Sequence, residues 1–596
     1  MVAEDESRRK RSLARLLTTF RFARGLSAPY FTGTERWIAW RLVFALTLLT
    51  IVIVGTAVLF TYWQRGLFNA LESKDWPAFL ALLLSWHTTP EDGLTIGFVP
   101  LLLVFVLANV YRLYLQQRLQ LRWRQWMTEQ YLGKYFGSQI YYRLSLDKDA
   151  TDNPDQRIAE DINLFTEKTL GLGVGLFENL ISMLSFIVLL WALSRDVSFF
   201  GVYIPGSLVW IALLYATIGT LITHIIGRKL VPLSFNQQRY EADFRFSLIR
   251  AREHAEGIAF YRGEQREQKR IRSVFQNVLE NFSRIIDVTK RVTISITGLA
   301  QANLVFPLII AAPAYFAGSI PLGGVFQTAN ALNKVVENLS WFVENYIKLA
   351  DYSATIDRLV GFESDVERAS RTRTGANYSE AAGSSYLSCR NLSVFKPDGD
   401  RLLEKVDLQI SKGDWTLISG ASGSGKTSLL RTCAGLWPYT SGDVAIAKVE
   451  TMFVPQRPYL PDGNLNFVLT YPHAQRVFSD GDIDEVFLTL GLEHLKVLGD
   501  HETSWMKTLS GGELQRLAIA RIALQKPALV FLDEATSQLD PDMEIAAYRL
   551  LQQKVPDATL VSVAHRASVG QFHTRILSLK GRALKEVGHL QQRLSD

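Results

Sequence analysis

The segment from Gly420 to Thr427 has the residue types and spacing of a phosphate-binding loop. It lies between an apolar run, Trp415 to Ser419, and the start of a leucine-containing helix at Ser428. Glycines let backbone N–H groups point at phosphate oxygens, and the first turn of the following helix adds its positive end. Lys426 is expected to reach the β- and γ-phosphates, and the Thr427 hydroxyl to ligate Mg²⁺. The predicted phosphate-binding residues are Gly420, Ala421, Ser422, Gly423, Ser424, Gly425, Lys426, Thr427 and Ser428.

Two acidic residues follow a second buried strand further along the chain. The run from Ala528 to Leu532 is apolar and ends in Asp533 and Glu534. This arrangement presents two carboxylates at the edge of a sheet, beside the bound phosphates. Asp533 would hold Mg²⁺, directly or through water, and Glu534 would polarise the attacking water. An apolar strand ending in acidic residues is a weak signal alone, and the phosphate loop upstream makes it a strong one.

These groups need an α/β fold that places a loop after one strand and carboxylates after another. From about Tyr386 onward, strand-like segments alternate with helical ones, which is the pattern of an α/β nucleotide-binding domain. Residues 363–385 are rich in Ser, Thr, Arg, Gly and Ala and have little apolar periodicity, which is typical of a linker. The sequence therefore predicts an α/β domain over residues 386–596, preceded by a linker over residues 363–385.

The first part of the chain has the composition of a membrane domain. The 596 residues are 48% hydrophobic, and the mean hydropathy of +0.08 is high for a soluble protein of this size. The run from Leu42 to Tyr62 is about 20 residues long, enough to span a hydrocarbon core of about 30 Å. Further spans are predicted at Ile96–Leu115, Gly171–Leu193, Val202–Ile226 and Thr293–Phe316, with a more polar sixth at about Pro321–Ile347. We therefore expect six transmembrane helices within residues 1–362, embedded in a lipid bilayer.

The net charge of +6 does not indicate nucleic acid as a partner, because the arginines are concentrated beside apolar runs. Residues 112–168 and 228–291 are rich in Lys and Arg, whereas residues 72–93 and 194–201 are not. The positive-inside rule then puts both termini and the α/β domain in the cytoplasm. Both basic segments also have a helical pattern, so the flanking spans are expected to continue past the membrane as helices.

The sixth predicted span carries a polar face. Its members recur at steps of three and four residues: Gln327, Asn330, Lys334, Glu337, Trp341 and Glu344. Ionisable residues inside a span usually face a bundle interior or a water-filled path, so this face is predicted to line a cavity. The alternative is that Lys334 and Glu337 pair with each other and only hold helices together. Two interpretations also remain for the polar run at residues 152–157, which is either a plain turn or a contact that carries force to the α/β domain.

Several separated motifs in the first half resemble one known family. They are Trp63 to Phe79, Leu121 to Met127 with Tyr141 to Arg143, Asp152 to Ile158, Glu241 to Glu264, and Gly323 to Gln327 with Ser340 to Phe342. The chain resembles the membrane domain shared by the SbmA/BacA peptide transporters and the peroxisomal fatty-acyl (ABCD-type) ABC transporters. This resemblance implies a half-transporter, in which an exporter-type membrane domain and an ATPase domain share one chain.

The second half resembles ABC ATPases. The pentapeptide at residues 509–513 is similar to their defining motif, in which a serine and glycine amides bind the γ-phosphate of ATP held by the opposite subunit. The resemblance implies catalytic roles for Glu534, His565 and Gln456, and metal binding by Thr427, Gln456 and Asp533. It also implies ATP contacts from Ser510, Gly511, Gly512, Glu513 and, in the D-loop at residues 537–540, Asp540. Phe395 would stack on adenine, although a phenylalanine on a surface strand is the alternative.

One membrane domain and one ATPase domain per chain make a homodimer with two shared ATP sites the minimal machine. The resemblance implies an ATP-driven transporter, with ATP and Mg²⁺ as cofactors, that moves peptides or other bulky hydrophilic solutes inward across a bacterial inner membrane. A fatty-acyl or lipid transporter is the alternative. A membrane regulator gated by ATP, which translocates nothing, is disfavoured because Lys426, Asp533, Glu534 and His565 are all present.

Overall fold

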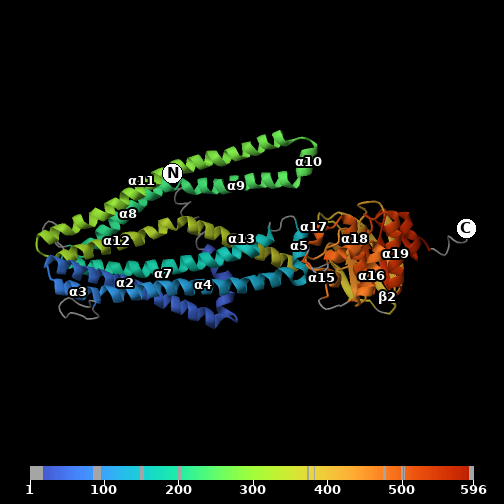
Figure 1. The fold of residues 1–596 in the computed structure, drawn as a ribbon, viewed down its shortest axis with the longest axis horizontal. Coiled ribbons are helices and arrows are strands. Elements are labelled where there is room, and N and C mark those ends of the chain that lie inside the picture. Colours follow the sequence, from blue (N-terminus) through green and yellow to red (C-terminus); the bar gives the residue numbers. More distant parts are fainter. Residues whose placement is uncertain are drawn as a thin grey trace. The chain divides into compact units, whose positions relative to one another are not determined.

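The first part of the chain forms long helices and the last part an α/β domain (Figure 1). The structure is a computed structural model, and it describes residues 18–84, 96–147, 153–196, 204–371, 375–381, 383–473, 478–498, 501–502 and 504–589. The chain divides into two units. The first comprises Met1–Gly133 and Thr151–Glu363, and the second comprises Lys134–Ala150 and Ser364–Asp596. The expected membrane domain, residues 1–362, therefore contributes an internal segment to the second unit.

The first unit is built from helices. The long ones are α2 (Arg36–Glu72), α4 (Phe98–Phe136), α7 (Ile162–Leu193), α8 (Ser207–Gly227), α9 (Leu230–Glu253), α11 (Glu264–Phe316), α12 (Leu322–Glu344) and α13 (Tyr346–Arg371). The shorter ones are a helix over residues 18–32, α3 (Trp76–Leu84), α6 (Pro154–Gln156), the π-helix η2 (Arg157–Asp161), η3 (Ser194–Asp196) and α10 (Ala255–Phe260).

Five described stretches of helix are long and apolar enough to cross a membrane: Arg36–Glu72, Phe98–Leu146, Pro154–Leu193, Ser207–Glu253 and Glu264–Phe316. Each overlaps one of the first five predicted spans. The predicted sixth span, α12, is not among them, since polar residues recur along one of its faces. Its passage through the membrane stays a prediction.

Two of these helices are much longer than a membrane is thick. α4 has 39 residues and α11 has 53. At about 1.5 Å per residue, they are about 60 Å and 80 Å long, against a hydrocarbon core of about 30 Å. The expected continuation of the spans as helices is therefore confirmed. α9 and α11 run side by side and are joined by the short helix α10 (Figure 1).

α12 is a shared neighbour of α2, α7, α8 and α11. Its buried apolar face packs with side chains of α7 and α8, in a cluster that includes Phe186, Leu190, Leu208, Ala212, Ala331, Leu332, Val335 and Val336. This packing leaves the opposite side of the helix for the polar residues.

The first turn of α12 is held tightly against α2. A Cβ atom on Gly323 would lie 2.0 Å from the carbonyl oxygen of Arg65, so no larger residue fits there. The N–H groups of Leu322 and Gly323 donate to the side chains of Glu72 and Asn69, at 2.9 and 3.0 Å respectively. Two side chains of α2 therefore satisfy N–H groups that the start of a helix leaves unpaired.

The second unit contains two sheets. The six-stranded sheet has the order β10–β9–β4–β8–β7–β6, with β4 (Trp415–Gly420), β6 (Thr451–Val454), β7 (Leu529–Asp533), β8 (Thr559–Val563), β9 (Arg575–Lys580) and β10 (Ala583–His589). The four-stranded sheet has the order β1–β5–β2–β3, with β1 (Ala376–Glu380), β2 (Ser385–Phe395), β3 (Arg401–Ser411) and β5 (Thr440–Ile446). In the larger sheet all neighbours except β10 and β9 are parallel, so the loops after β4, β7 and β8 leave one edge together.

Helices cover these sheets and carry the remaining motifs. They are α14 (Lys426–Cys433), α15 (Leu465–Thr470), α16 (Asp480–Leu490), η4 (Glu493–Leu498), α17 (Trp505–Thr508), α18 (Gly511–Gln525), α19 (Pro541–Lys554) and η5 (Ala567–Phe572). α18 is buried along its length, with Leu517, Ile519 and Ile522 fully enclosed in the apolar core beside β7. This burial fixes the start of α18 relative to the end of β7.

Two segments depart from the expected linker and domain limits. α13 continues to Arg371, and β1 (Ala376–Glu380) pairs with β5, so the described part of residues 363–385 is largely regular structure. Residues 137–146, which form η1 (Gly137–Gln139) and α5 (Ile140–Leu146), belong with the second unit: Leu146 packs against its apolar core, and the Arg143 guanidinium donates to the carbonyl oxygen of Ala369 at 3.3 Å. Composition alone did not indicate either feature, because both depend on contacts with distant residues.

Candidate functional site

The phosphate loop connects β4 to α14, as the sequence predicts. Gly423 and Gly425 have φ angles of +75° and +100°, in the left-handed region that favours glycine. The Lys426 ammonium donates hydrogen bonds to the carbonyl oxygens of Gly420 and Ala421, both at 2.9 Å. Lys426 is buried, and this burial lowers its pKa. The loop therefore encloses a positive charge on a curved backbone, which is what a polyphosphate requires.

Asp533, the last residue of β7, lies beside this loop. Its Oδ1 accepts a hydrogen bond from the Thr427 hydroxyl at 3.0 Å. Asp533 is 4% exposed, and burial raises the pKa of its carboxyl group. The buried Ser424 hydroxyl has no hydrogen-bond partner among the residues that the structure describes. Hydroxyl and carboxylate oxygens placed together are the ligands that Mg²⁺ prefers, so these residues fit a magnesium ion.

Glu534 brings the three predicted catalytic residues together. Its Oε2 accepts a hydrogen bond from the Gln456 side-chain amide at 2.9 Å, and its Oε1 lies 3.0 Å from Nε2 of His565. Glu534 has a φ of +52°, and its N–H donates to the carbonyl oxygen of Val563 at the end of β8. The turn after β7 therefore aims this carboxylate between two side chains that hold it in place.

The predicted γ-phosphate-binding turn opens α18. Ser510 is the N-cap residue: its hydroxyl and its N–H both donate to Oε2 of Glu513, at 2.6 and 2.9 Å. These two donors, and then the His494 ring 2.9 Å from Oε1, lower the pKa of the Glu513 carboxyl group. Glu513 therefore orders the turn and donates its own N–H to the Ser510 hydroxyl, which leaves the N–H groups of Gly511 and Gly512 as the donors for an anion.

Phe395 and Asp540 have surroundings that the sequence did not specify. Phe395 ends β2, and the Arg401 guanidinium carbon lies 5.7 Å from the centre of its ring. Arg401 pairs with Phe395 across the β2–β3 hairpin, next to Leu402, which lies beside Gly425 of the phosphate loop. Asp540 caps α19, accepting a hydrogen bond from the Met543 N–H at 2.9 Å. A stacking role for Phe395 and an ATP contact for Asp540 stay predictions.

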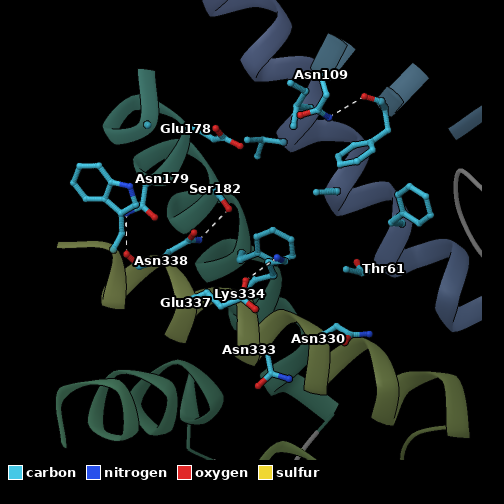
Figure 2. A pocket seen from close by; sticks show the side chains of 18 of the residues that line it. Thr61, Asn109, Glu178, Asn179, Ser182, Asn330, Asn333, Lys334, Glu337 and Asn338 are labelled. Atoms are coloured by element: carbon cyan, nitrogen blue, oxygen red, sulfur yellow. Dashed lines mark hydrogen bonds and ion pairs between the residues drawn. The ribbon is translucent and has the colours of Figure 1, made fainter. Parts of the chain in front are cut away.

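A cavity of about 730 Å³ lies between α2, α4, α7 and α12 of the first unit (Figure 2). Four residues of the predicted polar face line it: Asn330, Lys334, Glu337 and Trp341. Gln327 is fully buried and does not line it, although it shares a helical direction with Lys334, so the cavity wall ends before this first part of α12. The Glu344 side chain lies outside the described part of the chain.

The cavity wall is rich in carboxamides. Six of its lining residues carry one: Gln64, Asn109, Asn179, Asn330, Asn333 and Asn338. The side-chain amide of Asn338 donates to the Ser182 hydroxyl at 2.9 Å. The side-chain amide of Asn179 donates to the backbone carbonyl oxygen of Asn338 at 2.8 Å. Sequence reasoning predicted Asn330 and missed the other five: Gln64, Asn109 and Asn179 come from three other helices, and Asn333 and Asn338 were not assigned to the polar face.

The charged residues of the cavity are paired. The Lys334 ammonium lies 2.7 Å from Oε2 of Glu337, so the ion pair that the sequence offered as an alternative exists, and it lies on the cavity wall. Glu178 of α7 accepts a hydrogen bond from Arg112 of α4. Both residues belong to α12, three positions apart, so this pair does not hold two helices together, and its place on the wall agrees with the cavity-lining interpretation.

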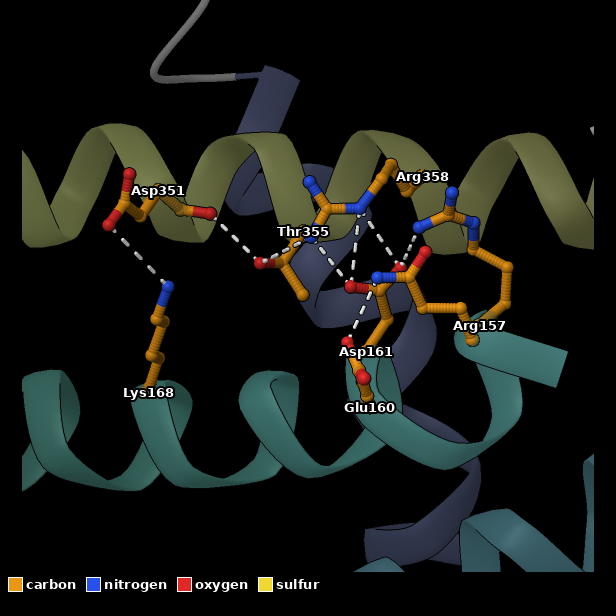
Figure 3. A network of polar contacts seen from close by, with 8 residues as sticks. Arg157, Glu160, Asp161, Lys168, Asp351, Thr355 and Arg358 are labelled. Carbon is orange, nitrogen blue, oxygen red and sulfur yellow. Dashed lines mark hydrogen bonds and ion pairs between the residues drawn. The ribbon is translucent and has the colours of Figure 1, made fainter. Parts of the chain in front are cut away.

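A second polar cluster joins α7 to α13 (Figure 3). The Asp161 carboxylate is 2% exposed and receives the Arg358 guanidinium in a forked pair, at 2.6 Å from Nη2 and 2.9 Å from Nε. Arg157 donates to the same carboxylate from within its own helix, at 2.5 Å. About two turns along each helix, Lys168 lies 3.9 Å from Asp351, so charges link these two helices at two levels.

Known families match both parts of the chain. The family described as ABC transporter transmembrane region 2 matches residues 26–316, and the family described as ABC transporter matches residues 403–537. The inner membrane ABC transporter ATP-binding protein YddA of Escherichia coli is 33% identical over 91% of this chain and 94% of its own length. This chain belongs to the ABC transporter family. It is an ABC half-transporter that couples ATP hydrolysis to transport across a membrane.

Other relatives of this ABC transporter confirm the predicted resemblance to the D-type members. ABC transporter D family member 2 of Arabidopsis thaliana, a chloroplastic protein, is 30% identical over 93% of this chain and 85% of its own length. The lysosomal cobalamin transporter ABCD4 of Homo sapiens is 28% identical over 78% of this chain and 80% of its own length. A solved structure of a bacterial Atm1-family ABC exporter with ATP bound has a TM-score of 0.67, at 16% identity over 93% of this chain and 96% of that chain. That likeness confirms the exporter-type fold.

Proposed function

We propose that two copies of this chain form one transporter, and that the cavity between α2, α4, α7 and α12 receives a peptide-like or other bulky hydrophilic solute. The observation that carries the proposal is the wall of six carboxamides: Gln64, Asn109, Asn179, Asn330, Asn333 and Asn338. Carboxamides donate and accept hydrogen bonds at once, so they match a solute that carries peptide-type groups. A homodimer would double this wall around its two-fold axis.

A bare acyl chain fits this wall less well. Placing it against carboxamides and the Lys334–Glu337 pair would remove water from these groups and offer no hydrogen bonds in return. The D family relatives keep a fatty-acyl or lipid solute as the alternative, and the cobalamin transporter supports a bulky polar solute. A regulator without transport stays disfavoured by the intact set of hydrolytic residues. The YddA relative and the basic segments support a bacterial inner membrane location with both termini in the cytoplasm, and inward movement of the solute is part of the proposal.

The ATP site is proposed to work through fixed charges. Lys426 and the loop N–H groups bind the phosphates, and Thr427, Asp533 and the Gln456 side chain hold Mg²⁺, which neutralises the phosphate charge when bound. Glu534 accepts a hydrogen bond from the attacking water and polarises it. His565 lies against the Glu534 carboxylate and can also contact the γ-phosphate.

Ser510 of each copy is proposed to complete the ATP site of the other. Its turn presents N–H groups at the start of α18, where a γ-phosphate would be an additional anion.

A partner surface is also supported by α10 and the residue after it, where Phe260 and Tyr261 are 79% and 90% exposed. Large aromatic side chains exposed at a helix end are typical of a contact surface.

Thiol labelling tests the cavity. Single cysteines at Asn330, Lys334 and Glu337 should react with a membrane-impermeant thiol reagent in at least one nucleotide state. The matched controls are cysteines at Leu332 and Val336, which are 0% and 6% exposed on the packed side of the same helix. If the controls react while the three cavity positions resist in every state, the solute path lies on the other side of α12.

Uptake tests the solute class. Glu337→Ala should slow uptake of labelled peptides or cobalamin while basal ATP hydrolysis and dimer assembly survive, since the ATP site lies in the other unit. Equal uptake by this variant and the original chain, or transport of fatty-acyl solutes alone, would contradict the proposed class.

A further inference from the structure

Gln515 is a buried glutamine that no part of the mechanism above uses. It lies in α18 behind the Ser510 turn and is 0% exposed. Its side-chain amide nitrogen lies 3.1 Å from the carbonyl oxygen of Gln456 and 3.4 Å from that of Glu534. The same nitrogen lies 3.3 Å from the Ser537 hydroxyl. Its side-chain oxygen accepts the N–H of Gln538 at 2.9 Å. One side chain therefore contacts three separate functional segments from the helix that carries Ser510.

Gln515 contacts the backbone of two residues, Gln456 and Glu534, that are assigned to ATP hydrolysis. Gln456 and Glu534 hydrogen-bond to each other through their side chains, and Gln515 holds the backbone of both. A carboxylate that must orient a water depends on the position of its backbone. An apolar side chain in place of Gln515 would leave buried polar groups unpaired, so the contacts can be broken by one substitution.

The D-loop is also held at the Ser510 turn. The Gln538 side chain lies over Gly511, where a Cβ atom would be 1.6 Å from the Gln538 side-chain oxygen. A larger residue at position 511 would displace the end of the Gln538 side chain. Gln538 is therefore tied to Gln515 by its backbone N–H, and its side chain lies beside Gly511, so the D-loop contacts the first turn of α18.

We infer that Gln515 is a positioning residue that couples the two ATP sites of the transporter. This inference rests on the proposed function, in which Ser510 of one copy completes the site of the other. Glu534 and Gln456 of a chain would then act in one site, and Ser510 and Gly511 of the same chain in the second. Gln515 contacts the first pair directly and the second through Gln538, so it links both sites within one chain.

The first test compares two buried glutamines of α18. Gln515→Met keeps the size of the side chain and removes its hydrogen bonds. The matched control is Gln525→Met: Gln525 is 4% exposed in the same helix and donates to the carbonyl oxygens of Leu469 and Tyr471, away from the ATP residues. We expect Gln515→Met to lower kcat between about fivefold and a hundredfold, as a displacement of a catalytic group does. The KM for ATP should stay within about twofold, because the phosphate loop is untouched.

Gln525→Met should leave kcat within about twofold. A kcat near the original value for Gln515→Met, or an equal loss in both variants, would overturn the positioning role. Should Gln515→Met fail to fold, Gln515→Glu has the same shape, keeps the acceptor for Gln538 and loses the amide donor. The same fall in kcat at unchanged KM is expected for it, and an unchanged kcat would overturn the inference.

The second test isolates the link between sites. A mixed dimer of one Glu534→Gln chain and one unaltered chain should keep one active site, which is completed by Ser510 of the altered chain. Adding Gln515→Met to the altered chain should slow that remaining site by about fivefold or more, although its Glu534 belongs to the other chain. Adding Gln525→Met instead should not slow it. An unchanged rate with Gln515→Met would overturn the coupling.

A third mixed dimer separates this failure from failure of the proposed function. Adding Ser510→Arg to the Glu534→Gln chain should abolish the remaining activity if the sites are shared. If activity persists with Ser510→Arg, the sites are not shared and the proposed dimer is wrong. If Ser510→Arg abolishes activity and Gln515→Met does not alter it, the dimer holds and the coupling by Gln515 is wrong.

Discussion

His573 should make the ATPase unit sensitive to acid. It is 1% exposed, its Nδ1 lies 2.9 Å from the Val569 carbonyl oxygen, and its Nε2 lies 2.9 Å from the Ser562 hydroxyl. Burial lowers the pKa of His573 from its ordinary 6.5 to about 4. The unfolded chain therefore binds a proton below about pH 6.5, whereas the folded chain resists it until about pH 4.

The sign and size of the effect follow from this difference. The contribution of neutral His573 to stability is complete above about pH 6.5 and is lost as the pH falls toward 4. Each pKa unit corresponds to about 1.4 kcal/mol, so the full loss is about 3 kcal/mol. At pH 5, where the folded histidine is still mostly neutral, linkage gives a loss of about 2 kcal/mol. For a unit of this size, that lowers the melting temperature by about 4–8 °C.

Calorimetry of the full chain in detergent, at about pH 7.5 and about pH 5, measures this effect. Other groups titrate in the same range, so the informative quantity is the difference from His573→Gln, which keeps polar atoms at the site and does not titrate. The melting temperature of the ATPase transition should fall by about 4–8 °C more in the original chain than in the variant. Equal falls in the two proteins would refute the assignment of a neutral, buried histidine to this position.

Three further predictions concern the site and the packing of the membrane unit. Glu534→Gln should keep ATP affinity and lose at least about 100-fold in turnover, measured by ATP binding and phosphate release. Co-expression of a Lys426→Ala chain with a Ser510→Arg chain should give mixed dimers more active than either parent, because one site carries both lesions and the other is intact. Gly323→Ala should destabilise the membrane unit by about 1–3 kcal/mol, whereas Gly298→Ala, with open space at its Cβ position, should not.

Each of these has a result that contradicts it. Near-normal phosphate release by Glu534→Gln would remove Glu534 from the role of orienting water. Mixed dimers no more active than their parents would mean that each chain carries a self-contained site. Equal melting temperatures for Gly323→Ala and Gly298→Ala in the same detergent would mean that α12 does not press against Arg65.

The local motifs were predictable from sequence because their chemistry lies in consecutive residues. The phosphate loop needs only Gly423 and Gly425 at positive φ and a helix after Lys426, and adjacent residues specify both. Asp533 could be placed near Thr427 because Asp533 ends one parallel strand and the loop that leads to Thr427 follows another strand of the same sheet. The carboxyl ends of parallel strands lie at one edge of a sheet, which is why such loops converge.

The other parts of the fold and of the sites depend on contacts between distant residues, which leave no pattern in the local sequence. Gln515 is an ordinary residue within its helix, and its role appears only when the backbone of Glu534 is beside it. The polar face of α12 was assigned from periodicity, which cannot tell that Gln327 is buried beyond the end of the cavity or that Asn333 is one of the residues that line it. Asp161 and Arg358 are separated by almost two hundred positions, and only the fold brings them together.

The Asp161 cluster contains one carboxylate and two guanidinium groups, and this imbalance has a mechanical consequence. If α13 moves away from α7, Asp161 keeps Arg157 as its partner, so no bare anion is left in the protein interior. The departing Arg358 side chain is already 38% exposed and gains water as it leaves. A buried ion pair is ordinarily costly to break because a lone charge remains behind. Separation of the two helices would break the Arg358–Asp161 bonds but would leave Asp161 paired with Arg157, which removes that part of the cost.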